Sequence, residues 1–419
     1  MGSVRPRTTV RLYLTASRLW LTAAGLSLLL PESARRGIWL PLHLTLAGAI
    51  SVAISGAMQT FVSALTATPA PPPWAVGVQF AFVNIGAGLV AAGYPSGHPT
   101  VVALGGSCFL AAMVFLGAFI ARARSKSLND RHRLPIAMYA SALIAIVIGG
   151  ILGALIGSGT VHDAGLWISL RRAHLTINVL GWVSLTICGT LVTFLPTVLR
   201  IRIPPWRGAA SCALLVVGVA AIAGGLATSL EPLAAAGGLV YVAGALGMAM
   251  MVGRALSTPH PSPVPVSAKH LVLGVAWFVV GAVLLAIALL RGSEALDAFG
   301  QSYLVIFVGG FAVQTLLGAW LYLLPTATPA HPDDRKKMLA AIEFGARFQL
   351  AALNGGLVLL GLRAAGWVPG WVGRAGAGLA LGGGGFALLK AWSFAVLANV
   401  PLLSSRHLEH QEPAPRAGR

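Results

Sequence analysis

Apolar residues run in long stretches along the whole chain, separated by short breaks that are polar or rich in proline. Each stretch has about 20 residues or more, the length that an α-helix needs to cross a hydrocarbon core roughly 30 Å thick. The breaks PAPPP before Trp74 and PHPSPVP at 260–266 contain prolines, which cannot continue a helix. The pattern predicts an all-α integral membrane protein with twelve transmembrane helices, over 11–30, 38–66, 74–93, 100–121, 135–157, 166–199, 208–228, 233–253, 270–290, 296–325, 348–366 and 375–399.

The composition excludes a soluble globular protein. Of the 419 residues, 57% are hydrophobic and 10% are charged, whereas a soluble domain carries about a quarter charged residues. Cys108, Cys188 and Cys212 lie in apolar stretches without C-x-x-C or C-x-x-C-H spacing, which excludes covalent c-type haem and cysteine zinc sites. Because the first apolar stretch lacks an A-x-A-like cleavage site, we expect it to remain as a helix.

The basic residues orient the predicted bundle. The chain has 29 Lys and Arg against 11 Asp and Glu, a net charge of +18. With the N-terminus inside, the cytoplasmic segments hold 20 of the 29 and the outer loops hold 7, while Arg18 and Lys390 lie inside spans. Because Lys and Arg near helix ends stay on the cytoplasmic side, we expect both termini inside. The positive charge then reflects topology, and we expect anionic lipid headgroups rather than nucleic acid as its partner.

Three of the predicted helices share a motif, G-x7-G-x4-(F/L). It occurs at Gly48–Gly56–Phe61, at Gly181–Gly189–Phe194 and at Gly310–Gly318–Leu323, with offsets of 133 and 129 residues. Spaced glycines can simply permit close helix packing, but three instances at similar offsets favour an internal repeat. The sequence therefore predicts one transmembrane domain over 1–403, built of four-helix pseudo-repeats at about 1–134, 135–268 and 269–403, with a disordered cytoplasmic tail over 404–419.

Few ionisable residues lie within the predicted spans. All eleven acids fall in loops, at the ends of spans or in the tail, which leaves His43, His174, Arg18 and Lys390. Ionisable groups are costly in a membrane and usually mark function. Proton- and sodium-coupled carriers commonly use intramembrane carboxylates, so a carboxylate-coupled pump or antiporter is disfavoured.

Four histidines are predicted near the outer face. His43 and His174 lie in the outer half of two spans, and His98 and His162 lie in outer loops. Neutral imidazole is a common ligand of haem iron and copper, so these four are candidate metal ligands. The alternatives are a hydrogen bond between helices for His43 or His174, and ordinary solvated loop residues for His98 and His162.

Two arginines precede His174 in the sequence. Arg171 and Arg172 would lie beside the propionates of a haem held by His174, because arginine forms forked hydrogen bonds with carboxylates. They are equally suited to anchor the helix at the membrane interface.

The remaining polar residues suggest no chemistry of their own. Six further histidines are expected at the inner surface, in contact with water: His132, His260, His270, His331, His407 and His410. Several uncharged polar residues within spans are expected to form hydrogen bonds between helices, although some could line a cavity: Asn84, Asn178, Gln59, Gln301, Tyr303 and Gln314.

The predicted architecture resembles the haem–copper oxidase catalytic-subunit superfamily. The shared features are twelve helices with both termini inside, three four-helix units, and histidines near the outer ends of the second and sixth helices. The resemblance is architectural and spans nearly the whole chain. It implies that His43 matches a haem ligand on the second helix and that His174 matches a copper ligand on the sixth. The segment AHLTINVLGWVSLTICGTLVTFLPT at 173–197 is also similar to bacterial NnrS-type membrane proteins, which are linked to copper or nitrogen-oxide metabolism.

The ligand set departs from that superfamily. The tenth helix has Gln301 and Tyr303 where the oxidases carry an H-x-H pair, and no histidine pair for copper follows around the seventh helix. When the repeated glycines are aligned, His174 matches Pro41 in the first copy and Tyr303 in the third. His43 lies two positions after Pro41, which is about 200° further around the helix, so His43 and His174 are not equivalent positions of the repeat. A complete oxygen-reducing or proton-pumping centre is therefore not expected.

The sequence leads to one main functional hypothesis. It is an oxidase-like protein of the bacterial plasma membrane with one reduced haem or copper site near its outer face. Its role would be electron transfer to a periplasmic or extracellular copper or redox protein, a response to nitric oxide or copper, or copper handling. The alternatives are a metal-free permease for an apolar solute and a structural or assembly subunit of a respiratory complex.

Overall fold

The computed structural model describes residues 6–127, 132–202, 208–328 and 332–399, and the regular elements among them are all helical. Twelve long rods make up the bundle, as the apolar pattern predicts. Nine are single helices: α1 (Pro6–Ser27), α5 (Pro73–Gly93), α6 (Pro99–Ser125), α7 (Arg133–Gly157), α10 (Gly208–Ala227), α11 (Glu231–Ser257), α12 (Val266–Leu290), α16 (Ala346–Ala364) and α17 (Gly370–Asn399). Two short helices, α2 (Glu32–Arg35) and α15 (Pro332–Glu343), lie between rods.

The other three rods are composite, because each contains a π-helical segment. They are α3 (Trp39–His43) with η1 (Leu44–Ile50) and α4 (Ser51–Thr66), α8 (Ala164–Thr176) with η2 (Ile177–Val183) and α9 (Ser184–Leu199), and α13 (Ser293–Tyr303) with η3 (Leu304–Val313) and α14 (Gln314–Ala327). These rods match the predicted spans 38–66, 166–199 and 296–325 to within three residues at each end. Each π segment contains the first glycine of one sequence motif: Gly48, Gly181 or Gly310.

Eleven of the rods are long and apolar enough to cross a membrane, so the described chain is that of a multi-pass membrane protein. The exception is α1, which corrects the prediction of twelve such spans. Arg11 and Arg18 and several hydroxyl residues reduce the hydropathy of α1. Arg18 is nevertheless only 2% exposed. It donates to the carbonyl oxygen of Ala391 in α17, at 2.5 Å, and its guanidinium carbon lies 4.7 Å from the ring centroid of Trp392.

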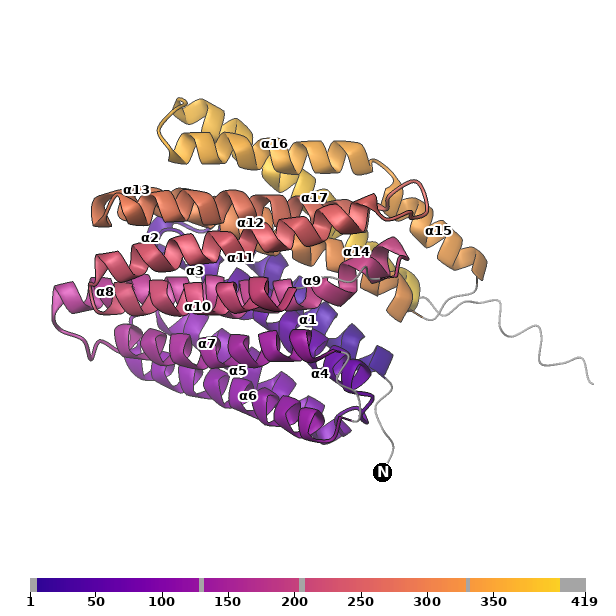
Figure 1. The fold of residues 1–419 in the computed structure, drawn as a ribbon, viewed down its shortest axis with the longest axis horizontal. Coiled ribbons are helices and arrows are strands. Elements are labelled where there is room, and N and C mark those ends of the chain that lie inside the picture. The colour runs from indigo at the N-terminus through magenta and orange to yellow at the C-terminus, as the bar shows by residue number, and fades with distance from the viewer. Residues whose placement is uncertain (1–5, 128–131, 203–207, 329–331, 400–419) are drawn as a thin grey trace, which may run out of the picture.

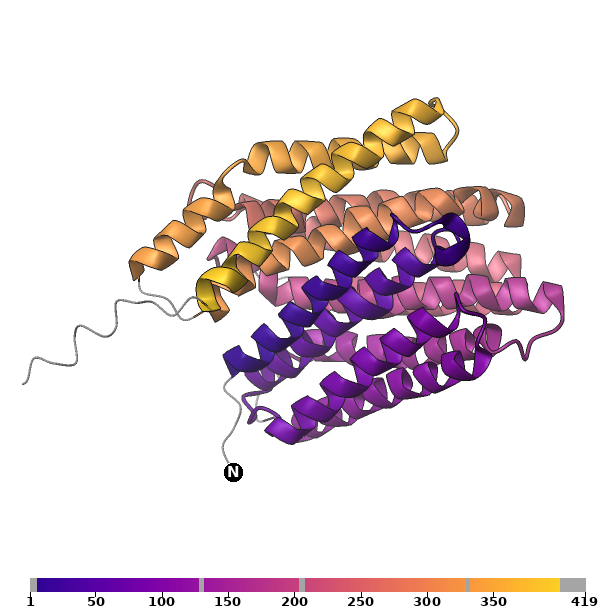
Figure 2. The same ribbon diagram turned by 180° about the vertical axis from the view of Figure 1, so that it is seen from behind.

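The rods run side by side between two ends of the bundle. Figure 1 shows α2, α8 and α13 at one end, and α4, α14 and α15 at the other. The first rod meets the last part of the chain, since α1 contacts both α14 and α17, and Figure 2 shows α1 and α17 on the same side of the bundle. The π segments also meet, because η3 contacts both η1 and η2. The three composite rods therefore form the centre of the bundle.

The motif glycines permit close packing of these central rods. In each rod both glycines face the long helix that precedes the rod in the chain, which is α1, α7 or α12. A Cβ atom added to any of them would lie closer than 3 Å to a neighbouring atom. The first atoms met would belong to Trp20 and Tyr13 in α1, Ala145 and Met138 in α7, and Trp277 and Ser267 in α12. Glycine is thus required for these helix contacts.

Candidate functional site

His43 ends α3, immediately before the π segment η1. Its Nδ1 atom lies 2.9 Å from the carbonyl oxygen of Trp39, one turn earlier. Because a carbonyl oxygen can only accept, Nδ1 carries the proton in this contact and Nε2 is the unprotonated nitrogen. The imidazole also stacks on the Trp39 indole, with ring centroids 3.8 Å apart, and Trp39 in turn stacks on Tyr94 at 4.2 Å. The ring of His43 is therefore held from two directions.

His174 lies in α8, shortly before the π segment η2. Its Nδ1 atom lies 2.8 Å from the carbonyl oxygen of Gly149 in α7, so by the same argument Nδ1 donates and Nε2 is unprotonated. The Asn178 amide nitrogen lies 3.0 Å from the same Nδ1 and donates to the His174 carbonyl oxygen at 2.8 Å. Both half-buried imidazoles thus have Nδ1 against a backbone carbonyl, and no protein hydrogen bond to either Nε2 occurs within the described residues.

Two glycines of α7 make room for the His174 side chain. A Cβ atom at Gly153 would lie 2.6 Å from Cε1 of His174, and one at Gly149 would lie 2.7 Å from the Asn178 amide nitrogen. The imidazole therefore packs directly on the backbone of α7. This contact fixes the ring in a position that a larger residue at 153 would not allow.

The two imidazoles lie at the same end of the bundle, here called the histidine end, which carries α2 and the loop between α7 and α8. Neutral imidazole protonated at Nδ1 leaves the Nε2 lone pair available, and neutral imidazole is the form of histidine that binds metals.

The predicted loop histidines are both exposed. His98 immediately precedes α6, and its side chain does not cap that helix. His162 lies in the loop before α8, next to Asp163, whose carboxylate caps α8 by accepting from the Leu166 backbone nitrogen at 2.6 Å. Across the described ranges, no group of three or more His, Cys, Asp or Glu is arranged to hold a metal ion. A metal at the histidine end would thus have at most two such protein ligands.

The two arginines before His174 have different surroundings. Arg172 forms a forked ion pair with Asp297 of α13, in which Nε lies 3.1 Å from Oδ1 and Nη2 lies 2.6 Å from Oδ2. Arg171 is exposed, with its guanidinium carbon 5.8 Å from the ring centroid of Trp167. The fork of Arg172 therefore joins α8 to α13. Arg171 has no carboxylate partner among the residues that the structure describes.

His270 corrects the expectation that the remaining histidines contact water. It is 0% exposed, because α16 covers it and places Nε2 of Gln349 2.7 Å from its own Nε2. Lys390 of α17 donates to Oε1 of the same Gln349 and to the carbonyl oxygen of Ile342, each at 2.8 Å. The sequence placed Lys390 inside a span but gave no partner for it. His331, His407, His410 and the tail over 404–419 lie outside the described residues.

Two of the six uncharged polar residues expected to join helices, Gln59 and Asn84, do so. Gln59 contacts Tyr13 of α1 at 2.9 Å, and Tyr13 donates to Gln79 of α5 at 2.5 Å. Asn84 accepts from the Trp20 indole at 2.7 Å, in the same manner as Asn354 accepts from Trp277 at 2.8 Å. The other four correct that expectation. The Tyr303 hydroxyl and both amide atoms of Gln314 are buried without a partner, Asn178 bonds to His174 within its own rod, and Gln301 is exposed.

Comparison with known proteins gives no relative from which a role could be transferred: no protein-family model matches the chain, and no curated protein matches it.

Proposed function

We propose that this chain is an oxidase-like membrane protein that binds one haem or copper at the histidine end, through Nε2 of His43 and of His174. The observation that carries the proposal is the shared geometry of the two rings. In each, Nδ1 donates to a backbone carbonyl, at 2.9 Å for His43 and 2.8 Å for His174, and Nε2 has no protein partner within the described residues. Metal-bound histidines typically have their second nitrogen held in this way.

The donor set fits haem or copper better than other metals. Both candidate ligands are neutral nitrogen donors, and no carboxylate or thiolate accompanies them in the described part of the chain. Calcium and magnesium prefer oxygen ligands, and structural zinc requires four ligands. Haem iron takes one or two axial protein ligands, and soft or nitrogen ligands suit copper. Either group, when bound, would supply one-electron redox chemistry.

The residues around the two histidines would then act as supports. Trp39 fixes the His43 ring by stacking and by its carbonyl oxygen, and Gly149 and Gly153 fix the His174 ring against α7. Arg171 would offer positive charge to haem propionates or to an acidic patch on a partner protein. His98 and His162, on exposed loops, would complete a copper site only after those loops move.

The repeat and the membrane orientation belong to the same proposal. The contacts of the motif glycines with α1, α7 and α12, and the π segment in each central rod, support three units at about 1–134, 135–268 and 269–403. The positive-inside rule supports cytoplasmic termini, which would place the histidine end on the outer face of a bacterial plasma membrane. A periplasmic or extracellular redox protein could exchange electrons with the site there.

An absorption spectrum and metal analysis of the purified protein test this function. The full chain would be expressed with ample haem and copper, purified in detergent, and measured oxidised and dithionite-reduced. We expect either a Soret band that shifts on reduction or about one copper per chain. Colourless protein without copper would contradict the proposal and would favour a metal-free permease or an assembly subunit of a respiratory complex.

A further inference from the structure

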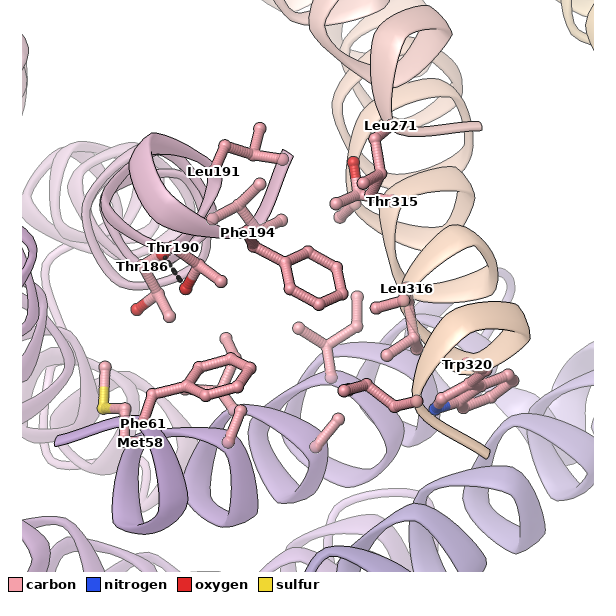
Figure 3. A pocket seen from close by; sticks show the side chains of 18 of the residues that line it. Met58, Phe61, Thr186, Thr190, Leu191, Phe194, Leu271, Thr315, Leu316 and Trp320 are labelled. Atoms are coloured by element: carbon pink, nitrogen blue, oxygen red, sulfur yellow. Dashed lines mark hydrogen bonds between the residues drawn. The ribbon is translucent and has the colours of Figure 1, made fainter. Parts of the chain in front are cut away.

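A cavity of about 80 Å³ lies among the three central rods, away from the histidine pair. Figure 3 shows side chains of α4, α9 and α14 surrounding it, with the rings of Phe61 and Phe194 on its border. Leu14 of α1 and Leu271 of α12 complete the wall, and no histidine takes part. The cavity is therefore separate from the proposed cofactor site, and an inference from it does not depend on that site.

The motif shared by the central rods accounts for this cavity. Phe61, Phe194 and Leu323, the third positions of the three motif copies, all line it. The glycines of the same copies face α1, α7 and α12 instead. Each copy thus has one face that packs against a neighbouring helix and one residue that borders the central space. The cavity is built from corresponding positions of the three rods rather than from a local packing defect.

The wall offers little to water. Thr186 and Thr190 line the cavity, but their hydroxyls donate to the carbonyl oxygens of Trp182 and Thr186, at 2.7 and 2.8 Å. The hydroxyl oxygen of Thr315 lies against Gly274, where an added Cβ would be 2.5 Å away. Among the lining groups, two buried polar atoms have no partner: this hydroxyl oxygen and the Trp320 indole nitrogen. A buried water needs two to four polar partners. Because the Thr315 hydroxyl lies against α12, these two atoms offer at most that minimum, so an apolar occupant is favoured.

The size of the cavity limits that occupant. A cavity of about 150 Å³ lined by apolar side chains holds benzene or xenon. The cavity here, at about 80 Å³, is roughly half as large and suits a molecule of one or two heavy atoms. We propose that it is a binding site for one small apolar gas molecule, of the class of dioxygen, nitric oxide or carbon monoxide.

Xenon is the probe for this site, because it is apolar, small and visible by anomalous diffraction. Crystals of the full chain would be pressurised with xenon, and we expect an anomalous peak between α4, α9 and α14. Ala57 lines the cavity, so Ala57→Leu should fill it and remove the peak. Ala213 is exposed on α10, so Ala213→Leu adds the same volume elsewhere and should leave the peak unchanged.

A milder variant covers the case in which Ala57→Leu does not fold. Ala319 also lines the cavity, and Ala319→Val should lower the xenon occupancy at least twofold relative to wild type. The proposal is overturned if the wild-type cavity takes up no xenon, if it contains ordered water or a lipid chain, or if the peak persists unchanged in both narrowed variants. Xenon uptake does not require a bound haem or copper, so a negative result here would leave the proposed cofactor site untouched, and loss of the cofactor site would leave this test valid.

Discussion

The Nδ1 atom of His174 lies 2.8 Å from the carbonyl oxygen of Gly149, and this contact turns a histidine of α8 toward the backbone of α7. The contact defines the protonated nitrogen and leaves Nε2 available. It depends on the absence of side chains at Gly149 and Gly153, which would otherwise occupy the space of Asn178 and the imidazole. The proposed cofactor site therefore depends on α7 as much as on α8.

Replacement of Gly153 tests that dependence. A Cβ atom there would lie 2.6 Å from Cε1 of His174, so Gly153→Ala should displace the ring and weaken cofactor binding by about 10–100-fold, as loss of a supporting contact does in other metal sites. Cofactor content after dialysis of the purified variant measures the effect. Gly224→Ala in α10, where the added atom meets nothing within 4 Å, serves as the control. Equal cofactor retention in both variants would show that the Gly153 contact does not support the site.

The ion pair between Arg172 and Asp297 gives a second prediction. The side chains are 22% and 62% exposed, so the pair should contribute about 0.2–1 kcal/mol to stability, as exposed pairs do. Arg172→Gln and Asp297→Asn should each lower the unfolding free energy by no more than that amount, measured by denaturant titration in detergent. If Arg172 instead holds a haem propionate, Arg172→Gln should release haem while Asp297→Asn retains it. Absorption spectra of the two variants separate these cases.

The buried amine of Lys390 gives a third prediction. It donates to the Ile342 carbonyl oxygen and to Oε1 of Gln349, so Lys390→Met leaves two buried acceptors without this donor. We expect the variant to lose about 1–3 kcal/mol of stability. Arg374→Met removes an exposed cation from the same helix and should change stability much less. Equal unfolding transitions for the two variants would show that the Lys390 hydrogen bonds contribute nothing net.

The sequence predicted the helices well because their signals are local. Long apolar stretches and proline breaks defined the rods, and Pro73 and Pro99 begin α5 and α6, as the residue's fixed φ angle favours. The π segments were not predicted, since an i→i+5 backbone pattern has no distinctive residue composition. α1 is less apolar than a membrane span because it contains Arg11 and Arg18, which is a local feature of the sequence. The burial of Arg18 instead depends on its contact with α17, more than 370 residues later in the chain.

The candidate site could be predicted only in part for the same reason. His43 and His174 were identified because ionisable residues inside spans are rare. Arg172 and Asp297 are 125 positions apart in the sequence, and no local sequence pattern predicts their pairing. His270 follows a proline-rich break and so resembled an interfacial residue, yet packing by α16 buries it completely. Contacts between distant helices decided each of these outcomes.

The spectra of three histidine variants test the central claim most directly. His43→Ala and His174→Ala should each reduce the Soret absorbance or the copper content of the purified protein at least tenfold, because each removes a proposed ligand. His98→Ala, at an exposed loop position, should retain the wild-type spectrum. If the protein holds its cofactor equally in all three variants, His43 and His174 are not its ligands and the proposed site is wrong.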